Sequence, residues 1–258
     1  MRVAITGAAS GIGAATAAVL KHQGAQVVAF DIAEPATDLH QWICLDMADP
    51  ESIAAAVHSA TGRFDALLNI AGLPPRKDQA SQVLAVNYVG LVGFTKQFVD
   101  KLNPGGSIVN LASRAGNDWQ ANIEQVAALM SVTNPDDLDT FVTAHDVDDV
   151  RAYHLSKEAV IVWTIQQTQD LLGRELRMNC VSPAAVSTGI LPEFKAAFGE
   201  RATKGIALAG RAGTPQEIAE LVAFLARPES SWIRGANIAI DGGLDAMLVS
   251  EMLSLRDS

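Results

Sequence analysis

The chain has 258 residues, of which 49% are hydrophobic and only 19% are charged. This length and composition predict a folded protein with a substantial core, and they exclude both a disordered chain and a small scaffold held together by disulfides. The apolar residues form only short runs and the net charge is −10, so we expect no membrane span and no nucleic acid or anionic lipid as a partner.

The two cysteines, Cys44 and Cys180, do not form a CxxC pair. Their number and spacing argue against a disulfide framework and against a zinc site, so we predict no bound metal. A strand is expected from residue 2 onward, which leaves no room for a signal or transit peptide. Together these features favour a cytoplasmic protein.

Short runs of β-branched residues alternate with stretches of about 12 to 20 residues that have helical periodicity. This alternation is typical of βαβ units, in which helices cover a parallel sheet. Two helices have clear start signals, since Asp49 precedes Pro50 at one and Thr214 begins a capping box at the other. The pattern predicts one α/β domain with a seven-stranded, mostly parallel, doubly wound sheet. The strands are expected around residues 3–6, 27–30, 43–45, 66–70, 108–111, 178–181 and 238–240.

A glycine-rich turn follows the first strand, with the sequence Thr6-Gly7-Ala8-Ala9-Ser10-Gly11-Ile12-Gly13. Glycines here let a pyrophosphate approach the backbone N–H groups and the positive end of the helix that begins at the turn. The second strand ends in Asp31, 18 residues after Gly13, where a carboxylate can accept hydrogen bonds from the hydroxyls of an adenosine ribose. A carboxylate at that place repels a 2′-phosphate, which favours NAD over NADP. The alternatives are a purely structural turn and a solvated acid at a strand end.

From residue 1 to residue 243 the chain resembles the short-chain dehydrogenase/reductase family. The motifs that carry the resemblance occur in family order: the glycine-rich turn, Asp46, Asn69-Ile70-Ala71-Gly72, Asn87, Ser113, Tyr153-x-x-x-Lys157, Arg177-Met178-Asn179, Ser182-Pro183 and Asp241-Gly242-Gly243. Two positions depart from the family pattern, because Ile70 replaces an asparagine and Ala184 replaces a glycine. The resemblance implies a single-domain Rossmann fold that binds a nicotinamide dinucleotide.

Oxidation of an alcohol requires a base for the hydroxyl proton, and the reverse reaction requires an acid. Tyr153 is the candidate, because Lys157 lies one helical turn later and its positive charge favours the phenolate. The resemblance implies that Ser113 holds the substrate oxygen, and that Lys157 and Asn87 pass the proton onward through a water. The alternatives are a surface Tyr–Lys pair, a turn serine and a buried helix asparagine. His154 is expected to point elsewhere, so we give it no catalytic role.

The resemblance also implies which residues contact NAD. Asp46 is expected at the adenine amino group, the backbone around Asn69 and Ala71 along the adenosine, and Val186 with Thr188 at the carboxamide. The predicted cofactor-binding set is Gly7, Ser10, Gly11, Ile12, Gly13, Asp31, Asp46, Met47, Asn69, Ala71, Gly72, Tyr153, Lys157, Pro183, Val186 and Thr188. Ordinary packing and turn roles are the alternatives.

Ser113 and Tyr153 are 40 residues apart, whereas about a dozen residues separate them in most family members. Roughly 28 extra residues, the insertion at about 118–148, are therefore expected to enter at the rim of the pocket. Residues 118–150 contain eight acids and no Lys or Arg. Apolar residues at helical spacing predict two short helices with a break at Asn134-Pro135. We expect a small helical cap, with simple packing on the core as the alternative.

A second element, the substrate loop at about 187–210, is expected to close over the substrate and to contribute Ile190, Leu191, Phe194 and Phe198. The blander interpretation of these apolar residues is an amphipathic helix packed on the body of the protein.

The insertion and the stretch from Lys157 to Trp163 resemble the bacterial branch of the family that contains coniferyl-alcohol dehydrogenase and 3α-hydroxysteroid dehydrogenase/carbonyl reductase. The resemblance implies NAD-dependent hydride transfer with a bulky apolar alcohol or carbonyl compound, most like the oxidation of an aryl-allylic alcohol. A 3α-hydroxysteroid dehydrogenase/carbonyl reductase is the alternative, and a non-catalytic NAD-sensing module is a more remote one. Family tetramers commonly pair through the helices that carry Asn87 and Tyr153, which the insertion could obstruct, so we expect a homo-oligomer, either a dimer or a tetramer.

Overall fold

The computed structural model describes residues 1–253. Its centre is a seven-stranded sheet in the order β3-β2-β1-β4-β5-β6-β7, and every neighbouring pair of these strands is parallel. The strand order reverses between β1 and β4, which is where ligands bind in open α/β sheets. The strands are β1 (Arg2–Thr6), β2 (Gln26–Asp31), β3 (Gln41–Cys44), β4 (Phe64–Asn69), β5 (Leu102–Leu111), β6 (Arg177–Pro183) and β7 (Asn237–Ile240).

The predicted seven-stranded, doubly wound fold is confirmed, with small differences at the strand ends. β3 ends at Cys44 and β4 ends at Asn69, one residue earlier than expected in each case. The physical reason is that Leu45 and Ile70 leave the sheet and line the cleft that lies beyond its edge.

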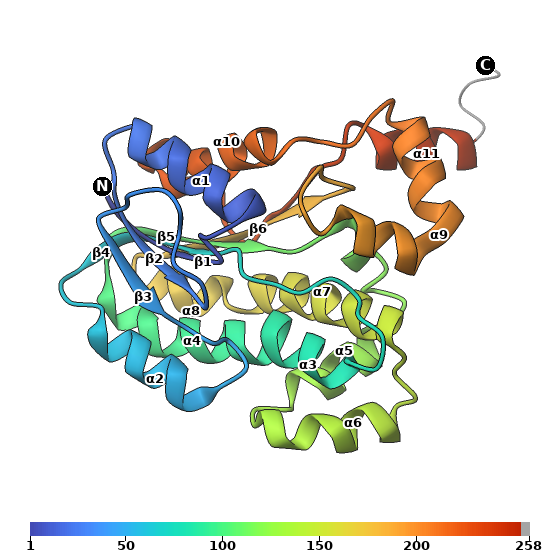
Figure 1. Cartoon of the computed structure of the whole chain (residues 1–258), viewed down its shortest axis with the longest axis horizontal. Coiled ribbons are helices and arrows are strands. Elements are labelled where there is room, and N and C mark those ends of the chain that lie inside the picture. Colours follow the sequence, from blue (N-terminus) through green and yellow to red (C-terminus); the bar gives the residue numbers. More distant parts are fainter. Residues whose placement is uncertain (254–258) are drawn as a thin grey trace.

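Helices cover both faces of the sheet (Figure 1). Helices α1 (Gly11–His22) and α10 (Pro215–Ala226) pack together on one face, and α2 (Pro50–Ser59), α4 (Leu91–Phe98) and α7 (Asp149–Gln166) lie on the other. Within residues 1–253 no helix is long and apolar enough to cross a membrane. The remaining helical elements are α3 (Ala80–Leu84), the π-helix η1 (Ala85–Gly90), η2 (Val99–Lys101), η3 (Arg114–Gly116), α5 (Ile123–Met130), η4 (Pro135–Asp137), α6 (Leu138–Ala144), α8 (Thr168–Gly173), α9 (Leu191–Leu208), η5 (Pro228–Ser230) and α11 (Leu244–Met252).

The central strands are apolar on both faces because both faces are covered. In β1, Ala4 packs into the core on the α4 and α7 side, whereas Val3 and Ile5 pack into the core on the α1 and α10 side. Successive residues of a strand point to opposite faces, so an apolar run without polar alternation is what a covered parallel sheet requires. The sequence therefore specifies the layers through strand composition.

Both predicted helix starts are confirmed. The Asp49 side chain accepts a hydrogen bond from the Glu51 N–H at 2.8 Å at the start of α2. At the start of α10, Thr214 and Glu217 form a reciprocal capping box, in which each side chain accepts from the other residue's backbone N–H. These caps fix where the two helices leave the loops that precede them.

The insertion at about 118–148 contains α5 and α6, which pack on α7 and α3 respectively. Val126 and Phe141, one from each helix, are buried there. The two helices lie on the outer side of the helical layer that covers the sheet (Figure 1). We expected the insertion at the rim of the pocket, but of its described residues only Asp118 lines the cleft. The apolar faces of α5 and α6 cover other helices instead.

Gly90, at the end of the π-helix η1, touches the loop that follows β3. A Cβ built on Gly90 would lie 1.8 Å from the Met47 carbonyl oxygen and 3.0 Å from the Ala85 carbonyl oxygen. Both obstacles are backbone atoms, so a side chain here cannot be accommodated by a rotamer change. The contact joins the helix that contains Asn87 to the loop that contains Asp46.

We predict that Gly90→Ala lowers the free energy of unfolding by about 1–3 kcal/mol, because the backbone must shift to admit the methyl group. Gly93→Ala is the matched control, since its Cβ would lie 3.9 Å from the Ile53 side chain and alanine favours the helix. Urea unfolding followed by circular dichroism measures both. Equal stabilities of the two variants would contradict the prediction.

Candidate active site

A cleft of about 1480 Å³ opens beyond the carboxyl ends of the strands. It is lined by the turn between β1 and α1, by the residues that follow β4, β5 and β6, by one side of α7, and by α9. All the strands of a parallel sheet end at one edge, so loops from distant parts of the sequence meet there. The cleft therefore gathers the motifs that the sequence separates.

Almost all of the predicted site residues line this cleft. The exceptions are Asn69 and Asn87, whose side chains are buried behind it. Asn69 donates to Thr95 Oγ1 and Asn110 Oδ1, each at 2.8 Å, so its side chain holds strands and helix together. The predicted residues that line the cleft are Gly7, Ser10, Gly11, Ile12, Gly13, Asp31, Asp46, Met47, Ala71, Gly72, Ser113, Tyr153, Lys157, Pro183, Val186 and Thr188.

The glycine-rich turn is packed so closely that its glycines cannot be replaced without movement. A Cβ on Gly7, whose φ is +74°, would lie 2.7 Å from the Ala71 N and Cα atoms. A Cβ on Gly13 would lie 1.9 Å from the Gly7 carbonyl oxygen. The Thr6 hydroxyl accepts hydrogen bonds from the Ile70 and Ala71 N–H groups at 3.1 and 3.2 Å. At Ile70, where the family pattern has an asparagine, the backbone is thus held by a hydrogen bond to β1.

Asp31 is held at the edge of the same turn. Its carboxylate accepts hydrogen bonds from the Ala9 N–H at 2.9 Å and the Ala33 N–H at 3.0 Å. Asp46 lines the next loop, and its carboxylate accepts from the Ala48 N–H at 2.8 Å. The bare backbone of the turn at a helix start, with Asp31 beside it, fits the pyrophosphate and adenosine ribose of a dinucleotide.

The loop after β6 lies against the glycine-rich turn. A Cβ on Gly11 would lie 3.4 Å from the Thr188 methyl group, so this loop reaches the glycine-rich turn. Val186 forms an isolated parallel bridge with Gly213, which fixes the start of the loop. These contacts hold Val186 and Thr188 in the cleft lining, next to the glycine-rich turn.

Tyr153 lines the cleft and is only 6% exposed. Burial raises the pKa of its phenol to about 12, and a hydrogen-bonding contact with the Ser113 side chain opposes that rise. Ser113 lies two residues after β5, directly before η3. Its Oγ also accepts from the Ala115 N–H at 3.1 Å, which fixes the orientation of the side chain. In the free protein Tyr153 is therefore a protonated phenol at neutral pH, next to a serine hydroxyl.

Lys157 lies on α7, one helical turn after Tyr153. Its Nζ atom lies 5.8 Å from the centre of the Tyr153 ring and donates to the Leu111 carbonyl at 2.8 Å. Burial lowers the pKa of the Lys157 ammonium to about 8. The group therefore carries its charge through the neutral range and loses it in mildly alkaline solution.

Asn87 lies behind the lysine, in the π-helix η1. Its Oδ1 accepts from the Leu73 N–H at 2.7 Å, and its Nδ2 donates to the Leu73 carbonyl at 3.0 Å. A Cβ on Gly72 would lie 3.1 Å from Asn87 Oδ1 and 3.5 Å from Lys157 Nζ. Asn87 and Lys157 therefore meet at Gly72, with Asn87 bonded to backbone groups and Lys157 facing the cleft.

Helix α9 brings two aromatic rings onto Tyr153. The Phe194 ring centre lies 5.1 Å from that of Tyr153 in an edge-to-face arrangement, and Phe198 stacks on Phe194 at 6.0 Å. The helix is kinked at Gly199, whose φ of +51° and ψ of −129° are not helical. An ion pair of 3.1 Å between Arg76 and Glu193 joins α9 to the loop after β4. The expected substrate loop thus contains a long kinked helix over the reacting groups.

The expectation that His154 points elsewhere is wrong. His154 lines the same cleft and its ring lies 5.4 Å from the Phe198 ring. Helical spacing places it about 100° from Tyr153, but α9 folds over both residues and encloses both. No local sequence pattern indicates this position, because the path of α9 depends on tertiary packing.

Sequence reasoning also missed the contribution of the C-terminal helix. Asp245 at the start of α11 pairs with Arg114, immediately after Ser113, at 2.5 Å, and accepts from Asn117 Nδ2 at 2.5 Å. Leu244 lines the cleft. The Asp241-Gly242-Gly243 motif was the available signal, since it placed the family pattern at the start of this helix.

Comparisons with known proteins agree with this geometry. Residues 1–128 match a family model described as short chain dehydrogenase, and residues 138–245 match one described as enoyl-(acyl carrier protein) reductase. The chain is 37% identical to coniferyl-alcohol dehydrogenase of Pseudomonas sp. strain HR199, over 96% of this chain and 98% of that one. It is 30% identical to 3-alpha-hydroxysteroid dehydrogenase/carbonyl reductase of Comamonas testosteroni, over 95% and 97% of the two chains.

Among solved structures, the crystal structure of 3-alpha-hydroxysteroid dehydrogenase from Pseudomonas sp. B-0831 complexed with NADH superimposes with a TM-score of 0.83 at 30% identity. The match covers 96% of this chain and 98% of that chain. The fold and the cleft define a dinucleotide-binding oxidoreductase. The chain belongs to the short-chain dehydrogenase/reductase family.

We predict that Gly7→Ala weakens dinucleotide binding at least ten-fold, because the added Cβ pushes the turn away from Ala71 and moves the backbone N–H groups. Gly24→Ala is the control: Gly24 also has a positive φ, +81°, but has no atom within 4 Å of its Cβ position. That change should cost about 1 kcal/mol of stability and leave binding unaltered. Titration of intrinsic fluorescence with NAD and NADP measures the affinities. Equal affinities of the two variants would disprove the prediction.

Proposed function

We propose that this protein is an NAD(H)-dependent dehydrogenase that transfers a hydride between nicotinamide and a bulky apolar alcohol or carbonyl compound, most like an aryl-allylic alcohol of the coniferyl type. The single observation that carries the proposal is that Tyr153, Ser113 and Lys157 lie together in one largely apolar cleft beside the glycine-rich turn. The similarity to the coniferyl-alcohol enzyme supports the substrate class.

In the oxidation direction Tyr153 takes the hydroxyl proton of the alcohol. Ser113 holds the same oxygen beside Tyr153 and donates to it as charge develops. The positive charge of Lys157 favours the phenolate form of Tyr153. Bound NAD would accept the hydride. In the reduction direction the protonated phenol supplies the proton to the carbonyl oxygen.

NAD rather than NADP is the proposed cofactor. The support is Asp31, whose carboxylate lies at the turn and is fixed by two backbone N–H groups. Ala8, Ala9 and Ser10 supply no cation for a 2′-phosphate. The relative whose structure contains NADH is consistent with this assignment.

The lining of the outer cleft supports an apolar substrate. Phe194 and Phe198 present aromatic faces and edges next to Tyr153, and such rings pack well on an aryl group. A 3α-hydroxysteroid dehydrogenase/carbonyl reductase remains the alternative, favoured by the structural similarity to such an enzyme. A nucleotide-sensing module without turnover is the more remote one, and it would not need the complete tyrosine, serine and lysine set.

The proposed assembly is a homo-oligomer in a reducing, cytoplasmic compartment. Helices α5 and α6 lie on α7 and α3, next to the surface through which family tetramers commonly pair. This placement supports a dimer over a tetramer. Cys44 and Cys180 are both free thiols, which suits a reducing compartment.

A panel of aryl-allylic alcohols, steroid alcohols and simple secondary alcohols, each with NAD and with NADP, tests the proposal. We expect NADH formation with NAD, fastest with the aryl-allylic alcohols, and at least ten-fold lower kcat/KM with NADP. Tyr153→Phe should lower turnover at least about 100-fold and leave NAD affinity within two-fold. Binding of NAD without turnover of any alcohol or ketone would favour the sensing module.

The pH dependence follows from the pKa of Tyr153, which burial raises to about 12. Oxidation needs the phenolate, so kcat/KM for the alcohol should rise with pH from about 6 to about 8, above which Lys157 loses the charge that favours the phenolate, whereas reduction needs the phenol and should not rise. Lys157→Met removes the nearby positive charge, so the oxidation profile should move up by about one pH unit or more. Steady-state rates in both directions measure this. Superimposable profiles would contradict the role of Lys157.

A further inference from the structure

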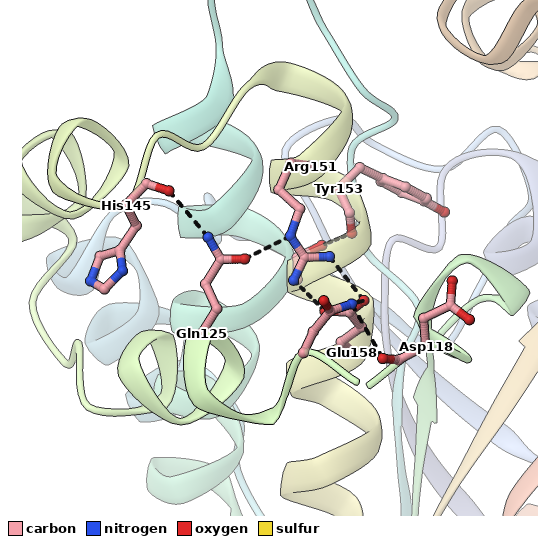
Figure 2. Close-up of polar contacts among 8 residues, drawn as sticks. Asp118, Gln125, His145, Arg151, Tyr153 and Glu158 are labelled. Atoms are coloured by element: carbon pink, nitrogen blue, oxygen red, sulfur yellow. Dashed lines mark hydrogen bonds and ion pairs between the residues drawn. The ribbon is translucent and has the colours of Figure 1, made fainter. Parts of the chain in front are cut away.

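A polar cluster built around the buried Glu158 lies on the side of α7 opposite to the cleft. It consists of Arg151 and Glu158 on α7, Asn122 and Gln125 at and in α5, and the backbone carbonyl of His145 after α6 (Figure 2). We refer to these residues as the brace. In Figure 2 the Tyr153 side chain extends away from Arg151 and Glu158. The proposed reaction uses none of the brace residues.

Glu158 is fully buried, and its carboxylate is matched by donors. Arg151 binds it with its two terminal guanidinium nitrogens, Nη1 to Oε1 at 2.9 Å and Nη2 to Oε2 at 2.6 Å. Asn122 Nδ2 donates to Oε1 at 2.8 Å. A buried carboxylate without such partners would be strongly destabilising, so the geometry of the three side chains is tightly constrained.

The same guanidinium carries the constraint into the insertion. Arg151 Nε donates to Gln125 Oε1 at 2.7 Å, and Gln125 Nε2 donates to the His145 carbonyl at 3.3 Å. Asn122 Nδ2 also donates to the Asp118 carbonyl at 3.2 Å. One charged pair on α7 therefore fixes the start of α5, the middle of α5 and the turn that leads from α6 back into α7.

The brace acts on the turn of α7 that carries the reacting groups. Arg151 and Glu158 flank Tyr153 and Lys157 in the sequence, and Glu158 directly follows Lys157. On the other side, η3 packs against the same turn: a Cβ on Gly116 would lie 2.7 Å from the Lys157 carbonyl carbon and 2.9 Å from the Glu158 N atom. Since η3 begins right after Ser113, a shift of this turn would move Lys157 relative to Ser113.

We propose that Arg151 and Glu158 are positioning residues. Through the brace, the insertion holds the Tyr153–Lys157 turn in register with Ser113. This inference rests on the proposed function, because its consequence is a rate of proton and hydride transfer. Proton transfer depends on oxygen atoms held within hydrogen-bond distance, so a small displacement of the turn lowers kcat. Tyr153 and Lys157 belong to the predicted cofactor-binding set, but the other members, among them the glycine-rich turn and Asp31, lie on other elements, so we expect NAD affinity to change much less than kcat.

The test replaces both charges at once, Arg151→Met with Glu158→Met, so that no unpaired charge stays buried. We expect kcat for the panel's best alcohol to fall at least ten-fold, while its KM and the NAD dissociation constant stay within three-fold. Arg151→Lys keeps the charge but loses the two-pronged contact, and its kcat should lie between those of the wild type and the double variant. All rates are measured at a temperature where circular dichroism shows each protein folded.

The control removes an ion pair elsewhere, with Arg174→Met and Asp100→Asn. The Nη2 atom of Arg174, just after α8, lies 2.5 Å from Oδ1 of Asp100 in η2. The kcat of this control should equal that of the wild type. A double brace variant that is folded and has unaltered kcat would overturn the inference, because a purely stabilising cluster would lower only the unfolding temperature.

Hydrogen exchange measured by mass spectrometry separates this inference from the proposed function. In the NAD-bound protein the brace variant should exchange faster than the wild type in peptides that cover residues 118–148 and 151–158, and the control should not. If the wild type turns over no substrate, the proposed function fails, and the exchange result alone decides whether the brace exists. Unchanged exchange in peptides of residues 151–158 would refute the brace.

Discussion

The whole cleft depends on one close backbone contact, between the first turn and the residues after β4. Gly7 approaches Ala71 so closely that its Cβ would lie 2.7 Å from backbone atoms, and the Thr6 hydroxyl ties the two segments together by accepting from the N–H groups of Ile70 and Ala71. The contact lies at the point where the strand order reverses. The glycine-rich turn and the loop that leads toward Asn87 are fixed relative to each other there. The remaining elements of the site are arranged around this contact.

Helix α7 is the second fixed element, and it is held from three directions. The Asp149 carboxylate at its start accepts from the N–H groups of Asp78 and Gln79, which belong to the loop that lines the cleft. The backbone of η3 lies against its middle turn at Gly116. The insertion holds its outer side through Arg151. The acidic character of the insertion is compatible with a structural role, because the Asp139 carboxylate accepts from the Ser81 hydroxyl and the Asp148 carboxylate accepts from the Arg151 N–H group.

How far the sequence predicts this protein depends on the range of the interactions. The glycine-rich turn, Asp31 and the Tyr153–Lys157 spacing are local patterns, and the site residues predicted from these patterns line the cleft. Interactions between distant segments were not predictable: the contact of Gly90 with the Met47 carbonyl, the Arg114–Asp245 pair and the location of His154 each depend on where a loop or α9 comes to lie. The insertion was expected at the rim because of its place in the sequence, but its apolar faces found partners on α3 and α7.

The brace also solves an electrostatic problem that α7 creates. Lys157 and Glu158 are neighbours in the sequence and both are buried, so an uncompensated Glu158 carboxylate would attract the lysine charge away from Tyr153. Arg151 and Asn122 satisfy that carboxylate on the outer side of the helix. The Lys157 ammonium is left to face Leu111, Gly72 and the Tyr153 ring. Burial lowers the pKa of Lys157 to about 8, and the charge that remains at neutral pH lies on the Tyr153 side of the helix, away from Glu158.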